Sequence, residues 1–413
     1  MAVVRKGIML GRGAFLAFVA FATAASMDAG RQTAGARATA NVDVRTLPAT
    51  VYTVVEGVDR PLDDRAASAH ADPQNLTWLF HVVLTSRERE PLRIERARAR
   101  FSRGGITQWE EAFSRPYLER MEWIQGAFDM TPEYYLAKVL HGAEQSGTPD
   151  IPAGGTVSWV RVAFARPWFG LVDSIALQFD LVAPSQRTVT LDHTVPVVHY
   201  QQKRPLRLPF GGTWAVNVGN DLSTGHRRSG LNGLTSVGWD FVKLGPDAMP
   251  FRRDGKTPQD FYTYGEPVLA AAAGTVVDVR NDIREYGIGV APSGDELRAD
   301  GDVFSGNLVT VDVGNGEYTF TCHMLMGSVP VKKGDRVQAG QVVGRVGMSG
   351  YAGVPHIHFN LISGPKWLDA RGLPALFSGF ERIRTGGAPQ RIDRGNPVTD
   401  WLIRNREDSW PSR

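Results

Sequence analysis

The chain has 413 residues, of which 42% are hydrophobic, 45 are glycine and 25 are proline. This length predicts two folded domains, and the glycine and proline content favours short strands joined by turns. The formal net charge is +3, and Arg5, Lys6 and Arg12 supply all of it within the first 24 residues. The remaining chain is formally neutral, which argues against nucleic acid as a partner.

The first residues have the layout of a secretory signal. The three basic residues precede an apolar run at residues 14–22, and Ala22-Thr23-Ala24 supplies a small-residue cleavage site. The run is too short for a comfortable membrane span. We therefore expect residues 1–24 to be cleaved, leaving a periplasmic or secreted protein without a stable span; an uncleaved anchor is the alternative. Cys322 is the single cysteine, so an intramolecular disulfide is excluded.

The pattern that follows predicts a first, strand-rich domain. Residues 25–40 are small and polar and are expected to be a disordered lead-in. Residues 41–182 are expected to form a β-sandwich-like domain with a helical insertion, because residues 108–145 depart from the strand pattern and Thr131-Pro132 is a candidate helix start. Apolar residues on every second position predict the half-buried strands, as in Leu76, Trp78, Phe80, Val82, Leu84, Ile175, Leu177, Phe179 and Leu181.

A second strand-rich region is predicted after a linker at residues 183–209. It spans residues 210–375, where short strands are interrupted by glycine, as is typical of an antiparallel sheet or barrel. The polar stretch 281–306 is expected to be a long loop. Residues 376–413 are expected to be a polar C-terminal tail that packs loosely.

Two closely spaced histidines lie near the end of this second region. His356 and His358 alternate with Ile357 and Phe359, which is a strand pattern, so both imidazoles project from one face. This arrangement suits one metal ligand beside one group that acts on a metal-bound water. Paired histidines on a strand are also common as half-buried, hydrogen-bonded residues.

Three further residues are candidates for the same site. Asp240 is the lone carboxylate of the apolar stretch 237–241, and burying it requires an ion pair or a bound cation. His226 precedes Asp240 by fourteen residues in a polar stretch, and His323 ends the strand pattern of residues 318–323. The spacing alone leaves their roles open.

Taken in chain order, these stretches resemble the lysostaphin-type (M23, LytM-like) zinc endopeptidases over roughly residues 210–363. Residues 265–277 are similar to the family's G-x-P-V-x-A-A-x-x-G-x-V block, and residues 331–350 to its second glycine-rich block. Pro355-His356-Ile357-His358-Phe359 resembles its closing P-H-x-H-F signature. The resemblance implies an antiparallel LytM-like β-sheet peptidase domain.

The resemblance also implies Zn²⁺ held by His226, Asp240 and His358, with His323 and His356 handling protons and stabilising the transition state. Two imidazoles and one carboxylate leave the fourth tetrahedral position of zinc open for water, as in catalytic sites. The implied activity is hydrolysis of peptide bonds by a zinc-activated water. The implied substrate is the peptide cross-links of peptidoglycan, or another peptide.

One departure from the family pattern concerns the first ligand. The commonest form has a histidine four residues before the aspartate, where this chain has Ser236. Relatives with a longer insertion favour His226, and Asp221 is the fallback ligand, or else a turn or cap residue. The alternative functions are an inactive LytM-like module that binds cell wall or regulates another hydrolase, and a lipoyl- or biotinyl-type carrier. Nothing in the sequence indicates an oligomeric state.

Overall fold

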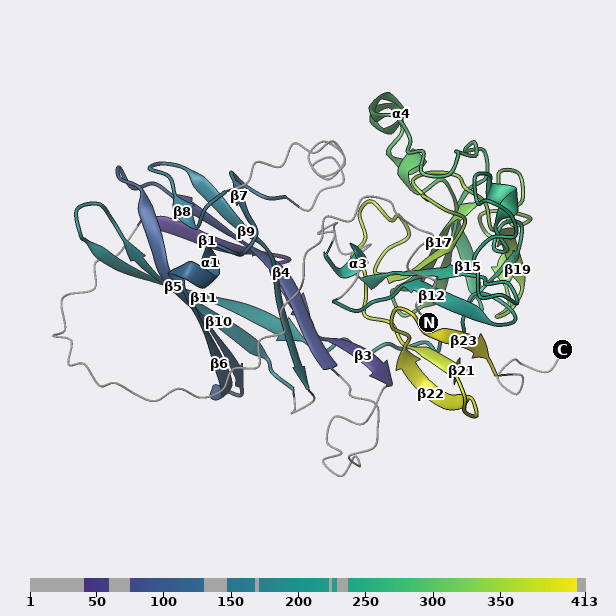
Figure 1. The fold of residues 1–413 in the computed structure, drawn as a ribbon, viewed down its shortest axis with the longest axis horizontal. Helices are drawn as coiled ribbons and strands as arrows, with labels where there is room; N and C mark the ends of the chain where they lie inside the picture. Colours follow the sequence, from purple (N-terminus) through teal and green to yellow (C-terminus); the bar gives the residue numbers. More distant parts are fainter. Residues whose placement is uncertain are drawn as a thin grey trace.

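The computed structural model describes residues 41–58, 75–129, 147–167, 171–222, 225–228 and 237–406. These residues are mainly β-strand, with few and short helices, so the predicted fold class is confirmed (Figure 1). In this part of the chain, no helix has the length and apolar character needed to cross a membrane. The predicted signal segment, the lead-in and the helix start at Thr131 lie outside the described residues.

The N-terminal region consists of two sheets around one core. The first sheet contains β1 (Val42–Leu47), β3 (Val54–Val58), β4 (Asn75–Ser86), β9 (Thr156–Pro167) and β7 (Trp123–Gln125). The second contains β2 (Val51–Tyr52), β11 (Thr188–Val198), β10 (Ser174–Val182), β5 (Leu92–Arg103), β6 (Ile106–Ser114) and β8 (Asp150–Ile151). Rings from both sheets meet between them, as Phe101 of β5 and Phe164 of β9 do at 4.9 Å between centroids.

Two predictions for this region need correction. The stretch expected to begin a helical insertion is largely strand, because β6 pairs along β5, and the only helix described there is α1 (Arg115–Leu118). The expected linker from residue 183 contains β11, which pairs along β10. The outward face of β11 is polar, so its few buried apolar residues are spread thinly along the sequence: Val189, Leu191, Val195 and Val197.

The C-terminal region continues one long antiparallel sheet. Its strands follow the spatial order β18 (Arg336–Val337), β15 (Gly274–Arg280), β16 (Asn307–Gly314), β17 (Glu317–Met324), β20 (Ile357–Ile362), β13 (Trp239–Val242), β12 (Trp214–Val218), β23 (Leu402–Asn405), β21 (Phe377–Ile383) and β22 (Gln390–Asn396). A separate pair joins β14 (Pro267–Leu269) to β19 (Val342–Arg345). Both pack on a shared apolar core.

The expectation of a loosely packed tail after residue 376 is wrong. Three strands form there, and β23 pairs with β12 while β22 pairs with β3 of the N-terminal region. The pairing of β22 with β3 makes the sheet continuous between the two regions (Figure 1). The apolar residues of this segment are isolated among charges but are buried by these long-range contacts: Phe377, Phe380, Ile392, Trp401 and Ile403.

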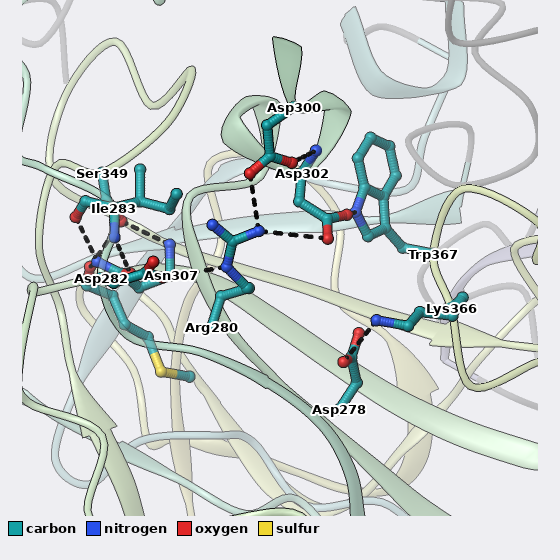
Figure 2. Close-up of polar contacts among 11 residues, drawn as sticks. Asp278, Arg280, Asp282, Ile283, Asp300, Asp302, Asn307, Ser349, Lys366 and Trp367 are labelled. Carbon is teal, nitrogen blue, oxygen red and sulfur yellow. Dashed lines mark hydrogen bonds and ion pairs between the residues drawn. The ribbon is translucent and has the colours of Figure 1, made fainter. Parts of the chain in front are cut away.

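The stretch 281–306 is also more structured than expected, because it contains α4 (Gly294–Ala299) and η5 (Gly301–Phe304). Arg280, at the end of β15, holds this segment through Asp300 at 2.9 Å and Asp302 at 3.6 Å (Figure 2). The indole nitrogen of Trp367 donates to Asp302 at 2.9 Å. These contacts hold the segment near β16 and β17, and β17 carries His323 of the site described next.

Candidate metal centre

Three adjacent strands and one short helix bring the predicted site residues together. Asp240 lies on β13 and His358 on β20, directly opposite each other in the antiparallel register. His323 lies on β17, the other neighbour of β20, and His356 immediately precedes β20. His226 lies on α3 (Gly225–Arg228).

The carboxylate of Asp240 is the centre of the cluster. Its Oδ2 lies 3.3 Å from Nε2 of His226, and its Oδ1 lies 2.9 Å from Nδ1 of His358 and 3.2 Å from Nε2 of His356. One ligand atom each from His226, Asp240 and His358 fall within 4.8 Å of one another. The same holds for His323, His356 and His358, so the two groups share His358.

Each of the four imidazoles has one ring nitrogen beside an oxygen that can only accept a hydrogen bond. The pairs are His226 Nδ1 with Gly238 O at 3.1 Å, His323 Nδ1 with Ser349 O at 2.9 Å, His356 Nδ1 with Val354 O at 2.8 Å, and His358 Nε2 with Asn360 Oδ1 at 2.5 Å. An accepting oxygen requires the proton on that ring nitrogen, so the opposite nitrogen of a neutral ring carries a lone pair. Metal-binding histidines are held in this way.

The lone pairs of three of these rings face the Asp240 carboxylate. Nε2 of His226, Nε2 of His356 and Nδ1 of His358 are the nitrogens close to its oxygens. Lone pairs and a carboxylate at about 3 Å repel one another unless a proton or a cation lies among them. The arrangement is therefore a buried donor set that requires positive charge at its centre.

The charge of the cluster separates the pKa values of its members. Burial tends to raise the pKa of Asp240, but His226 and His356 hold it well below its usual range. Burial tends to lower the pKa of His356, yet Asp240 raises it above the ordinary value. Burial and the charges of His356 and His358 hold the pKa of His323 well below its ordinary range. His323 is therefore neutral at pH 7, whereas His356 favours a proton.

A β-bulge aims His323 toward the other histidines. Asn307 pairs with Met324 and Val309 with Thr321, so one residue of β16 faces two residues of β17. His323 has φ of 62°, in the left-handed region, and its ring centroid lies 4.8 Å from that of His356. Bulges commonly re-aim a side chain at a functional site.

Buried polar side chains support the bulge from behind. The Oγ of Ser349 accepts from the Asn307 amide at 2.9 Å and donates to the Met324 carbonyl at 2.6 Å. The side-chain amide of Asn307 donates to the Met324 carbonyl at 3.1 Å, and Figure 2 shows Asn307 and Ser349 side by side. Cys322, beside His323, packs with Phe320 in a separate apolar cluster, and burial raises the pKa of its thiol, so it is not a nucleophile here.

Residues 259–370 match the family model of Peptidase family M23. This stretch is therefore similar to the M23 peptidases. His323, His356 and His358 lie inside the matched segment, whereas His226 and Asp240 precede it. The metal-ligand candidates therefore join residues inside and outside the recognised part of the domain.

Solved structures of M23 proteins are similar to parts of this chain. The catalytic domain of the prophage-encoded M23 protein EnpA from Enterococcus faecalis, as a mutant, is 21% identical over 42% of this chain and 91% of its own, with a TM-score of 0.21. The catalytic domain of lysostaphin from Staphylococcus simulans is 21% identical over 39% and 88%, with a TM-score of 0.22. A putative M23 peptidase from Pseudomonas aeruginosa is 16% identical over 65% and 86%, with a TM-score of 0.24. No curated protein matches.

The fallback ligand Asp221 lies apart from both metal-ligand groups. Its Oδ2 accepts from the amide of Thr399 at 2.9 Å and from the Thr399 hydroxyl at 2.7 Å, so it ties its loop to the segment before β23. Among the described residues, Asp221 belongs to neither metal-ligand group. Its contacts agree with the alternative role of a turn residue. Ser236 lies outside the described residues.

Sequence reasoning missed the residues that orient the histidines. Asn360 sits two positions after His358 on the same strand face, so the alternation contained a signal for it. Gly238 is needed for close approach, because a Cβ there would lie 2.8 Å from Nδ2 of Asn360. The carbonyls of Ser349 and Val354 carry no sequence signal, since any residue has a carbonyl.

Proposed function

We propose that this protein is a zinc-dependent endopeptidase in which His226, Asp240 and His358 hold the ion. The observation that carries the proposal is the buried donor set, in which imidazole lone pairs and a carboxylate face one another and call for a cation. Two imidazole nitrogens and one carboxylate oxygen are the ligand types zinc prefers. A catalytic zinc held by three protein ligands would lower the pKa of a bound water to about 7 and polarise a substrate carbonyl.

His323 and His356 suit the two remaining roles. Nδ1 of His323 donates to the Ser349 carbonyl, which leaves Nε2 as a neutral base able to accept a proton from water. Nδ1 of His356 is held by the Val354 carbonyl at 2.8 Å and its Nε2 lies 3.2 Å from Asp240, so the ring is placed at the centre, where it could contact a developing oxyanion.

The proposed substrate is the peptide cross-link of peptidoglycan. The M23 match supports a peptide substrate, and export by residues 1–24 would deliver the protein to the cell wall, in the periplasm or outside the cell. The carrier hypothesis loses its support, because residues 331–347 lie inside the M23 match. All five site positions are occupied by ligand-type residues, which favours an enzyme over an inactive wall-binding module.

The test combines metal analysis of the purified protein with digestion of purified sacculi, using Asp240→Ala as the matched control. We expect about one zinc per chain and release of soluble wall peptides by the unaltered protein only. A protein without zinc would overturn the metal assignment. A zinc-loaded protein that cleaves neither sacculi nor cross-link peptides would overturn the enzyme proposal in favour of the binding or regulatory module.

A further inference from the structure

The helix that carries His226 is held by the N-terminal region. Arg227, the next residue, is only 4% exposed, and its Nη2 donates to Oγ1 of Thr77 on β4 at 3.2 Å. Figure 1 shows α3 on the side of the C-terminal region that faces β4. Two successive residues of α3 thus point to different regions: His226 lies at the metal centre, and Arg227 contacts the N-terminal strands.

The buried guanidinium is balanced by charge from both regions. Burial lowers the pKa of Arg227 to about 10, while the carboxylates of Glu56 and Asp221 act in the opposite direction. Glu56, on β3, also accepts from the amide of Leu222 at 2.9 Å. One N-terminal carboxylate therefore bears both on Arg227 and on the backbone that leads into α3. A buried charge of this kind is costly unless such partners remain.

The strand that carries Glu56 is fixed to the strand that carries Asp240. β3 pairs with β22, where Asn396 lies opposite Gly57. The side-chain amide of Asn396 donates to the Val55 carbonyl at 2.7 Å, and its Oδ1 accepts from the indole of Trp239 at 3.1 Å. Trp239 directly precedes Asp240. The residues that hold α3 and the carboxylate of Asp240 are therefore attached to the same set of paired strands.

We propose that β3 and β4 support the metal centre: Glu56 and Thr77 hold Arg227, and Arg227 positions His226 as a zinc ligand. This inference rests on the proposed function and assigns the N-terminal region a role in the site. Arg227 is a positioning residue, because it acts on the centre only through its neighbour. A four-residue helix has little stability of its own, so the contacts of Arg227 with Glu56 and Thr77 are needed to fix the position of α3.

The test measures the zinc dissociation constant of the full chain by competition with a chromophoric chelator. We expect Glu56→Gln and Arg227→Met to weaken zinc binding by about 10-fold, the lower end for loss of a supporting partner of a ligand. Thr77→Val, which removes one hydrogen bond, should weaken it by about 5-fold. The matched control is Glu110→Gln, which removes a partly exposed carboxylate of the same region, paired with Arg100 on the sheet surface, and should change nothing.

A double variant separates positioning from general destabilisation. If Glu56 acts through Arg227, then Glu56→Gln should add little to the loss in an Arg227→Met background. Co²⁺ substitution adds a spectroscopic readout, because loss of an imidazole ligand changes the visible spectrum of the bound ion. If Arg227→Met fails to fold, Thr77→Val carries the same test.

Two outcomes are decisive and distinguishable. Wild-type zinc affinity and an unaltered Co²⁺ spectrum in Glu56→Gln, Thr77→Val and Arg227→Met would overturn the positioning role and leave the proposed function intact. Strictly additive losses in the double variant would also overturn it. Absence of zinc from the wild-type protein would overturn the proposed function, and the positioning role with it.

Discussion

The N-terminal and C-terminal regions both bury histidine in a β-sheet, yet the backbone groups that face the rings differ. His81 on β4 is fully buried, stacks on Phe128 at 4.2 Å, and accepts a hydrogen bond at Nδ1 from the amide of Arg161 at 3.1 Å. In the candidate metal centre, the backbone partners of His226, His323 and His356 are carbonyls. A backbone N–H that donates to a ring nitrogen uses the lone pair of that nitrogen. A backbone carbonyl instead holds the proton on one ring nitrogen, so the lone pair of the other nitrogen points toward the centre of the cluster.

The charges near these rings also differ: a cation lies near His81, and a carboxylate lies near His356. Burial, together with the charge of Arg161, lowers the pKa of His81 to about 3. His356 is buried too, but Asp240 raises its pKa instead. Burial alone therefore yields an inert histidine, and convergence on a shared carboxylate yields a donor set.

The largest expected effect comes from removing that carboxylate. Asp240→Ala should abolish zinc binding, because the imidazoles lose the negative charge that gathers a cation among them, and His358→Ala should do the same. His81→Asn, which keeps an acceptor for the Arg161 amide, is the matched control and should retain about one zinc per chain. Zinc content is measured by elemental analysis after gel filtration, and unchanged content in both site variants would refute the assignment.

The next effect separates ligands from groups that act on protons. His323→Ala and His356→Ala should keep zinc but lower turnover by about 10²-fold or more, as expected for loss of a general base or an oxyanion donor. Turnover on a cross-link peptide and zinc content are measured on the same preparation. Full activity in His356→Ala would show that its role has been misassigned.

The comparison also shows what sequence patterns reveal. Alternation predicted the strand around Trp78 and Phe80, because successive side chains of a strand point to opposite faces, although β4 is buried on both faces and not on one. The H-x-H strand and Asp240 stood out because a polar residue in an apolar strand needs a chemical reason. Both signals are local.

Features that depend on distant segments carried no such signal. Arg227 lies in a polar stretch and looks like a solvated residue, and its burial depends on Glu56 and Thr77 far earlier in the chain. Asn396 sits in a segment expected to pack loosely, yet it is fully buried between β3 and Trp239. A single buried polar residue leaves no periodic pattern in the sequence, so its role becomes visible only when its partners in the structure are known.

The junction of the two regions gives the third prediction. Asn396→Ala removes bonds to the Val55 carbonyl and to the Trp239 indole, and it leaves buried polar groups with fewer partners. We expect a loss of about 3 kcal/mol in the free energy of unfolding, measured by urea denaturation. Gln338→Ala, at an exposed position, is the control and should change little. A loss in Asn396→Ala no larger than in the control would mean that the two regions are not coupled there.

The smallest expected effect is a pH dependence that belongs to the N-terminal region. The pKa of His81 is about 3 in the folded protein, against an ordinary value of 6.5. Between these values the unfolded chain binds a proton that the folded chain excludes, so His81 lowers stability as the pH falls below about 6.5. From pH 7 to pH 5 its contribution is a loss of about 2 kcal/mol, at about 1.4 kcal/mol per pH unit below the unfolded pKa.

His81→Asn should remove that part of the pH dependence and leave the part due to the metal-centre histidines. The measurement is the urea unfolding free energy at pH 7 and pH 5, in chelator, for wild type and variant. His193→Asn is the matched control, because His193 is only half-buried and its pKa is lowered less. An equal drop in stability for wild type and His81→Asn would show that His81 is protonated in the fold, and the contrast between an inert and an organised histidine would fail.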